Sequence, residues 1–250
     1  MSVAIAEAVG RAIDRMRRDL AEPVTVDELA SSAMFSKYHF TRVFRQHTGL
    51  SPARFLSALR IAAAKELLRS SSATVVDISH QVGYNSVGTF SARFHRSVGM
   101  PPSAYRRNEE ITGAAQRIAR RNTPPVLRGN ISPHARKLRQ PVFIGLFPGR
   151  IMEGAPARSV VLDCAGPYQF DDLPAGTWHL LAHSLPVAGH PVAGQSLVGG
   201  AGPVTIKRGV SAGIADLRLR PRCAFDPPML SALPEQCLAS FEPRVAHRAG

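Results

Sequence analysis

The chain contains little cysteine, few aromatic residues and no long apolar run. Its 250 residues include 3 cysteines and 1 tryptophan, and aromatic residues make up 6%. The cysteines all lie after residue 160 and show no CxxC or Cys/His spacing typical of metal ligands. An odd number without a secretory segment indicates reduced thiols, and we expect Cys164 to be buried in a strand.

Signals for export, membrane insertion and catalysis are also missing. Met1–Arg18 lacks the continuous apolar segment of a signal peptide, and no stretch of eighteen apolar residues occurs. We therefore expect a cytoplasmic protein without a membrane partner. The sequence has no G-x-S-x-G motif and no Pro-Cys-His alkyl-acceptor site. We expect no catalytic residue, no metal site and no cofactor.

Acidic residues are scarce relative to basic ones, and the imbalance is uneven. The sequence has 31 Lys and Arg against 18 Asp and Glu, a formal charge of +13. Residues 1–108 hold fifteen basic and eight acidic residues, 109–140 seven and two, and 141–250 nine and eight. A strongly basic segment attracts a polyanion, so the first 140 residues are the candidate nucleic-acid binding part.

Apolar spacing and capping residues predict helices through the first 108 residues. A helix over Val3–Ala21 is followed by the capping-box sequence Thr25–Glu28, in which Thr and Glu side chains bind free amides of a helix start. Ser36 can cap the next helix, and Gly49 suits the left-handed residue that ends it. Ser51 and Pro52 then open a helix that runs to about Arg69.

This arrangement repeats about fifty residues later. Thr74–Asp77 is a second capping-box opening, displaced by 49 from Thr25–Glu28. From the next helix the displacement is 50, in the pairs Phe40/Phe90, Phe44/Phe94, Gly49/Gly99, Pro52/Pro102 and Phe55/Tyr105. Matches at so many apolar and turn positions predict two copies of one helical unit.

Each copy has the pattern of a helix-turn-helix, in which the second helix enters the major groove of DNA. In the first copy the outward residues are Lys37, Tyr38, Thr41, Arg42 and Arg45. Arg42 is the candidate for a bidentate contact to guanine, whereas Lys37 and Arg45 suit phosphates. Tyr38 and Thr41 can supply apolar or hydroxyl contacts.

The second copy carries fewer charges on its outward face. We expect DNA contacts from Val87, Gly88, Thr89, Ser91, Ala92, Arg93 and Arg96. Ala92 stands where Arg42 stands in the first copy, so shape and phosphate contacts should dominate here. The joining helix of about eighteen residues is roughly 27 Å long. That length favours two recognition helices in successive major-groove segments, which recur every ~34 Å.

Residues Val3–Arg107 resemble the DNA-binding region of the AraC/XylS family of bacterial transcription regulators. The resemblance rests on DISHQVGYNSVGTFSARFHRSVGMPPSAYR and on LRIAAAKELLRSS. It implies a seven-helix bipartite domain that binds promoter DNA at the bacterial nucleoid, with RNA polymerase as a further partner of an activator. It places base-contacting positions on Tyr38, Thr41, Arg42, Val87, Gly88, Ser91 and Ala92. The family's familiar layout puts a ligand-sensing domain first, whereas a short leader stands here.

Glycine, proline and short β-like runs characterise the region after residue 140. We expect a basic linker at 109–140, a small all-β sandwich at 141–235 and an irregular tail at 236–250, following the all-α domain at 1–108. PYQFDDLPAGTWHLLAHSL resembles transthyretin-like or carboxypeptidase-regulatory-like sandwiches. The resemblance implies core positions for Leu173 and Trp178, and the turn at 174–176 needs positive φ at Gly176.

Two interpretations of this β region remain open. It is either a module for effector binding or self-association, or the seat of an enzymatic activity attached to a DNA-binding domain. His179 and His183 share one face of a strand, so they are either solvated side chains or two ligands of a metal completed by Asp171 or Asp172.

Overall fold

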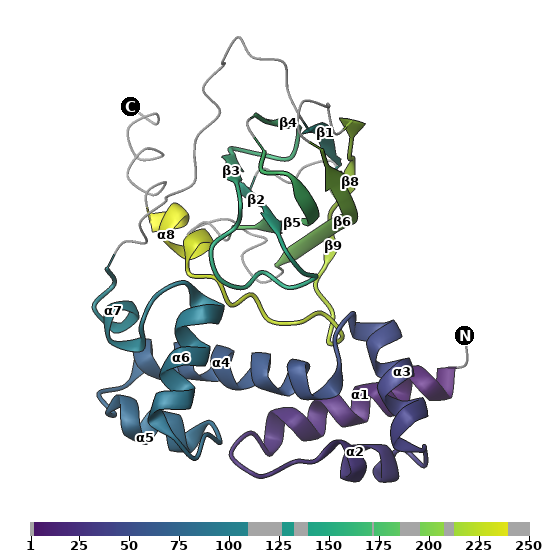
Figure 1. Cartoon of the computed structure of the whole chain (residues 1–250), viewed down its shortest axis with the longest axis vertical. Helices are drawn as coiled ribbons and strands as arrows, with labels where there is room; N and C mark the ends of the chain where they lie inside the picture. Colours follow the sequence, from purple (N-terminus) through teal and green to yellow (C-terminus); the bar gives the residue numbers. More distant parts are fainter. Residues whose placement is uncertain are drawn as a thin grey trace. The chain divides into compact units, whose positions relative to one another are not determined.

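The computed structural model describes residues 3–109, 127–132, 140–171, 173–185, 196–207 and 213–239 (Figure 1). The described residues form two compact units. A helical unit contains the residues up to Glu109 together with Cys223–Leu230, and a β unit contains the remainder. This confirms the expected multidomain class, an all-α region followed by a β-rich region.

Residues 3–109 form seven helices, as the sequence predicted. They are α1 (Val3–Arg18), α2 (Val26–Ser32), α3 (Lys37–Thr48), α4 (Pro52–Ser70), α5 (Val75–Gln81), α6 (Val87–Val98) and α7 (Pro102–Arg106). Within this unit, α4 runs between a group made of α1, α2 and α3 and a group made of α5, α6 and α7 (Figure 1). The joining helix is therefore the common support of both groups.

The predicted repeat is present in three dimensions, and we call residues 25–49 the first repeat and 74–99 the second repeat. α5 follows α2 at a displacement of 49, and α6 follows α3 at a displacement of 50, with equal helix lengths. Gly49 and Gly99 end α3 and α6 with φ of 77° and 97°. Glycine adopts such left-handed angles without the steric cost of a Cβ, which is why both helices end there.

Buried aromatic rings attach each recognition helix to the next helix. The ring centroids of Phe40 and Phe44 in α3 are 5.6 Å apart, and those of Phe44 and Phe55 of α4 are 5.5 Å apart. The same series of rings joins α6 to α7 through Phe90, Phe94 and Tyr105, with both spacings at 5.7 Å. These contacts bury one face of α3 and α6, and burial of large apolar groups supplies most of the stabilisation.

A late segment of the chain completes the helical unit. Arg17 Nη2 donates to the carbonyl of Ala224 at 3.3 Å, and the rings of His47 and Phe225 lie 5.7 Å apart. The buried Lys65 donates through Nζ to the carbonyl of Leu230 at 3.0 Å. Residues 223–230 lie in the range predicted for the β domain, so the structure differs from the sequence-based boundary. Contacts between residues this distant in sequence leave no local pattern.

The described residues of the β unit form two sheets. One sheet has the order β3-β2-β5-β6-β9, all antiparallel, from β2 (Val142–Phe147), β3 (Ser159–Leu162), β5 (Gly176–Ser184), β6 (Leu197–Ile206) and β9 (Arg220–Pro221). In the other, β1 (Leu127–Ser132) pairs with β4 (Pro167–Phe170), β7 (Gly213–Ile214) and β8 (Leu217–Arg218). Apolar residues of both sheets form one core cluster, as in a sandwich.

Three features of the β unit differ from expectation. Strand β1 lies inside the predicted linker 109–140, because its buried Leu127 and Ile131 belong to the core, and most other linker residues fall outside the described ranges. Helix α8 (Leu233–Ala239) extends into the predicted irregular tail. Cys164 follows strand β3 and is exposed, so its predicted burial is wrong.

The turn before β5 agrees with the sequence. Gly176 has φ of 150°, and the partly buried Trp178 donates from Nε1 to the carbonyl of Pro174 at 3.0 Å. Leu173 also packs against the core from a partly buried position. The transthyretin-like relationship itself stays a prediction.

Candidate nucleic-acid interface

Local sequence signals fix where α3 begins and which face it buries. Ser36 caps the helix, since its Oγ accepts from the backbone amide of His39 at 3.3 Å. Phe40, Val43 and Phe44 are buried at helical spacing. The opposite face therefore turns to solvent, and it is the face on which the sequence placed DNA contacts.

The predicted residues of α3 lie together on this open face. Lys37, Tyr38, Arg42 and Arg45 are exposed, and Thr41 is half-buried beside them. Tyr38 keeps 84% of its surface accessible, unusual for an aromatic side chain and available for stacking on a sugar or a base methyl group. Two cationic residues, Lys37 and Arg45, thus lie on either side of the candidate base-contacting residues along α3.

Two of these cations have partners within the first repeat. Lys37 Nζ lies 2.7 Å from Asp27 Oδ2 of α2, and both side chains are largely exposed. Arg42 Nη2 donates to His39 Nδ1 at 3.2 Å, one helical turn earlier. An exposed ion pair such as Lys37–Asp27 contributes little to stability, so a phosphate oxygen can replace Asp27 at small cost.

The outward face of α6 has smaller side chains and fewer charges than that of α3. Val87, Gly88, Thr89, Ala92 and Arg96 are exposed, and Ser91 is half-buried. A Cβ at Gly88 would meet only Ser86 Oγ, at 3.7 Å, so packing does not require glycine there. The open position leaves room for close approach of a DNA backbone to the first turn of α6.

Arg93 differs from the other predicted DNA contacts. It is half-buried, and its Nε donates to Ser57 Oγ on α4 at 3.2 Å. At the displacement of 50, Arg93 corresponds to Val43, which belongs to the buried face of α3. The structure therefore places Arg93 against α4, away from the exposed set. Its long side chain reaches a polar partner where valine in the first repeat needs none.

Comparison with known proteins identifies the helical region. Residues 29–108 match the family model of a helix-turn-helix domain. A Streptomyces lividans protein described as an AraC-like transcription regulator is 37% identical over 100 residues, 40% of this chain and 33% of the relative. The HTH-type transcriptional activator RhaS of Shigella boydii is 36% identical over 90 residues, 36% of this chain and 32% of the relative.

Residues 29–108 form a helix-turn-helix domain that is similar to those of AraC-like regulators, and we call it the AraC-type domain. The chain spans about a third of the length of the curated relatives it matches. The matched range contains α4 and both recognition helices.

Solved structures also show a likeness to the AraC-type domain. The DNA-binding domain of AdpA, solved with a target DNA, is 33% identical, with a TM-score of 0.38 over 43% of this chain and 93% of that one. The C-terminal domain of AraT from Geobacillus stearothermophilus is 28% identical, with a TM-score of 0.40 over 42% and 88%. The assignment rests on the family model and the sequence relatives.

Two further residues belong to the face of the AraC-type domain that carries α3. His39 holds Arg42 and packs its ring on Phe35, with centroids 4.9 Å apart. Met34, in the turn before α3, is 92% exposed. Neither residue was predicted from the sequence, although the three-residue spacing of His39 and Arg42 indicates a contact on one helix face.

Outside the AraC-type domain, the described residues offer no metal centre. No group of three or more His, Cys, Asp or Glu within them is placed to hold a metal ion. His183 is buried in β5, and burial lowers the pKa of the half-buried His179. Asp172 lies outside the described ranges.

None of the described helices has both the length and the apolarity needed to cross a membrane.

Proposed function

We propose that this protein is a bacterial transcription regulator that binds duplex DNA through α3 and α6. The observation that carries the proposal is the pair of helix-turn-helix copies in one chain, with recognition helices of equal length on one supporting helix. Dimeric helix-turn-helix proteins place two such helices in major-groove segments one turn apart. Here a single chain supplies both.

The length of α4 suits this arrangement. Its 19 residues span roughly 28 Å at 1.5 Å per residue. Successive major-groove segments on one side of the duplex are separated by ~34 Å, and recognition helices extend from both ends of α4. The dimensions support simultaneous binding of two neighbouring segments.

The two helices have unequal roles in this proposal. Arg42 on α3 is exposed and forms a bidentate contact with guanine, while Lys37 and Arg45 bind phosphates. On α6 the corresponding position is Ala92, so this helix contributes methyl, hydroxyl and shape contacts, with Arg96 binding phosphate. Sequence preference should therefore be stronger on the side bound by α3.

This function implies a cellular location and partners other than DNA. The protein acts in the bacterial cytoplasm at the nucleoid, without catalytic activity of its own. RNA polymerase is a further partner if it activates transcription. The β unit is the candidate site for a small-molecule effector or for self-association, since the AraC-type domain accounts for the DNA-binding residues.

Selection from a random duplex pool with the full-length protein tests the function. We expect enrichment of two short conserved segments about one helical turn apart, one of them better defined. Footprinting of an enriched duplex should show protection of two major-groove segments on one side. Failure to enrich any sequence, or protection of a single segment, would overturn the proposal. The Arg42→Ala variant serves as the matched control, because it should lose one conserved position only.

A further inference from the structure

At three positions where the second repeat differs from the first, its residue faces α4 or the α1–α2 loop. Met34, Phe35 and Val43 of the first repeat correspond to Gly83, Tyr84 and Arg93. Tyr84 places its hydroxyl 3.4 Å from Ser57 Oγ of α4, and Arg93 Nε donates to the same oxygen at 3.2 Å. All three changed residues of the second repeat face α4 or the loop that joins α1 to α2.

Gly83 shows that this approach is close. It has φ of 82°, and a Cβ there would lie 2.5 Å from the carbonyl oxygen of Leu20 and 2.8 Å from Arg60 Cζ. The equivalent Met34 has φ of 56° and is exposed, so the turn itself accepts a side chain. Contact with the α1–α2 loop therefore requires glycine at position 83, and the left-handed backbone conformation also favours it.

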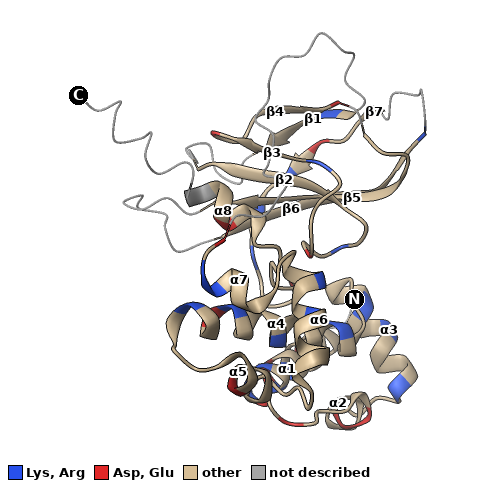
Figure 2. Cartoon of the chain, turned by 60° about the vertical axis from the view of Figure 1, so that its left-hand side comes forward, with Lys and Arg blue, Asp and Glu red and all other residues tan. Residues whose placement is uncertain are grey.

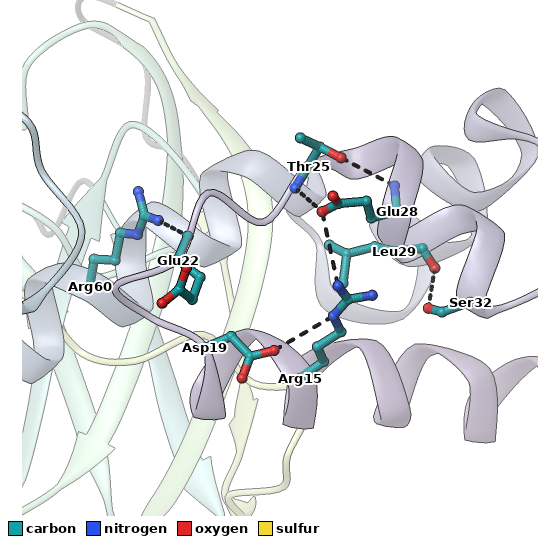
Figure 3. Close-up of polar contacts among 8 residues, drawn as sticks. All are labelled: Arg15, Asp19, Glu22, Thr25, Glu28, Leu29, Ser32 and Arg60. Atoms are coloured by element: carbon teal, nitrogen blue, oxygen red, sulfur yellow. Dashed lines mark hydrogen bonds and ion pairs between the residues drawn. The ribbon is translucent and has the colours of Figure 1, made fainter.

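Arg60 of α4 holds that loop. Its Nε donates to the carbonyl of Leu20 at 2.9 Å. Its Nη2 donates to the carbonyl of Glu22, also at 2.9 Å (Figure 3). Burial lowers the pKa of the Arg60 guanidinium from its ordinary value, yet arginine remains charged at neutral pH, and bonds from a charged donor are the stronger kind. The side chain thus joins α4, the loop and the turn of the second repeat.

The loop is in turn fixed to the first repeat. Arg15 of α1 lies 3.6 Å from Asp19 and 3.9 Å from Glu28, the acidic residue of the capping box (Figure 3). Glu28 Oε2 also accepts from the amide of Thr25 at 3.0 Å. A continuous set of contacts therefore runs from the start of α2, through the loop and Arg60, to the turn before α6.

We propose that the contact of Arg60 with Leu20, Glu22 and Gly83 fixes the orientation of α6 relative to α3, which makes Arg60 a positioning residue for recognition of two DNA segments at one spacing. The inference rests on the proposed function. α4 sets how far apart the recognition helices lie, but each repeat needs a further contact to stop it pivoting about an end of α4. Preorganised helices bind a matching site without the cost of ordering.

Affinity for duplexes of altered spacing tests the role of Arg60. The affinity of the full-length protein is measured for its selected duplex and for duplexes with one base pair inserted or deleted between the conserved segments. Each change rotates one segment relative to the other by roughly 35° and shifts it by about 3.4 Å. Wild type should lose about tenfold or more on either change, comparable to one mismatched contact. Arg60→Met should bind the original duplex more weakly and discriminate between spacings by about threefold or less.

Arg69→Met is the control, because it removes the same charge from an exposed position of α4. It should keep the wild-type spacing preference. If Arg60→Met does not fold, Arg60→Lys keeps the charge and one donor group and should give an intermediate preference. Unchanged discrimination in a folded Arg60 variant overturns the inference while leaving the proposed function intact. A wild-type protein that selects no paired segments instead overturns the proposed function.

Discussion

Met34 and Gly83 occupy the same position in the turns before α3 and α6, and both have positive φ, 56° and 82°. Met34 is exposed, whereas Gly83 packs beneath Arg60 and against the carbonyl of Leu20. The same backbone conformation therefore occurs in a solvent-exposed turn at Met34 and in a packed turn at Gly83.

Substitution at these two positions should change stability in opposite directions. Met34→Gly removes a left-handed penalty of ~1–2 kcal/mol and adds a backbone entropy cost of ~0.5–1 kcal/mol, a net stabilisation of up to about 1.5 kcal/mol. Gly83→Ala adds that penalty and a clash with Leu20, a loss of about 2 kcal/mol or more. Urea unfolding measures both, and a neutral Gly83→Ala would contradict the close contact.

Arg42→Ala should weaken binding to the selected duplex by ~1–3 kcal/mol and relax the preference at one base pair. Among the predicted base-contacting positions of α3 and α6, Arg42 alone has a guanidinium that can donate two parallel hydrogen bonds. The equivalent position on α6 is Ala92. Competition binding with all four bases at each position measures the effect. Arg45→Ala is the matched control and should weaken all sequences alike, with a salt dependence reduced by about one phosphate contact. Equal losses on random DNA from both variants would make Arg42 a phosphate contact.

Ala92→Arg should give α6 an arginine at the position equivalent to Arg42 of α3. The position is exposed on the same helix face as the predicted contacts, so the new side chain fits without repacking the core. We expect tighter binding, a salt dependence steeper by about one phosphate contact, and a new base preference in the segment bound by α6. Repeating the pool selection with this variant measures it. An unchanged preference would mean that Ala92 lies away from the base edges.

Acid should weaken the cap of α5 through Asp77. Hydrogen bonds from the Thr74 side chain, and then from its backbone amide, lower the pKa of Asp77 in the folded protein. The unfolded chain therefore binds a proton more readily, so this stabilisation is present above pH ~4 and is lost as pH falls through the folded pKa. Asp77→Asn should lower the melting temperature at neutral pH, by an amount that shrinks below pH ~4. Asp163→Asn controls for loss of one exposed carboxylate, and a pH-independent difference would contradict the assignment.

A fragment of residues 1–109 should bind the selected duplex, with affinity that falls steeply with salt. It should melt several degrees below the full chain, because it lacks residues 223–230 and with them the fully buried Leu230 and the partner of Lys65. Differential scanning calorimetry and titration at several salt concentrations measure both properties. DNA binding that needs the β unit would contradict the assignment of function to the AraC-type domain.

Much of the candidate interface could be predicted from the sequence because its signals are local. Ser36, Gly49 and Gly99 mark helix ends within a few residues of the bonds they make, and the spacing of Phe40 and Phe44 fixes the buried face. Once that face is fixed, exposure of Lys37 and Arg42 follows from helical geometry. The repeat then places the same elements fifty residues later.

Other features escaped the sequence analysis because their partners are distant in the chain. The helical pattern placed Arg93 at the margin of the open face, and only Ser57 on α4 shows that it turns inward. Strand β1 looked like linker because its charged and glycine residues mask the buried Leu127 and Ile131, whose core neighbours come from later strands.

The amino-acid order by itself determined the seven helices, the duplicated unit and the residues on the open face of α3, since each depends on contacts within one or two helical turns. The tertiary structure decided that Gly83 and Arg60 meet at Leu20 and that residues 223–230 complete the helical unit. Such contacts form only when segments far apart in the chain pack together. Their energies depend on distances that no local pattern encodes.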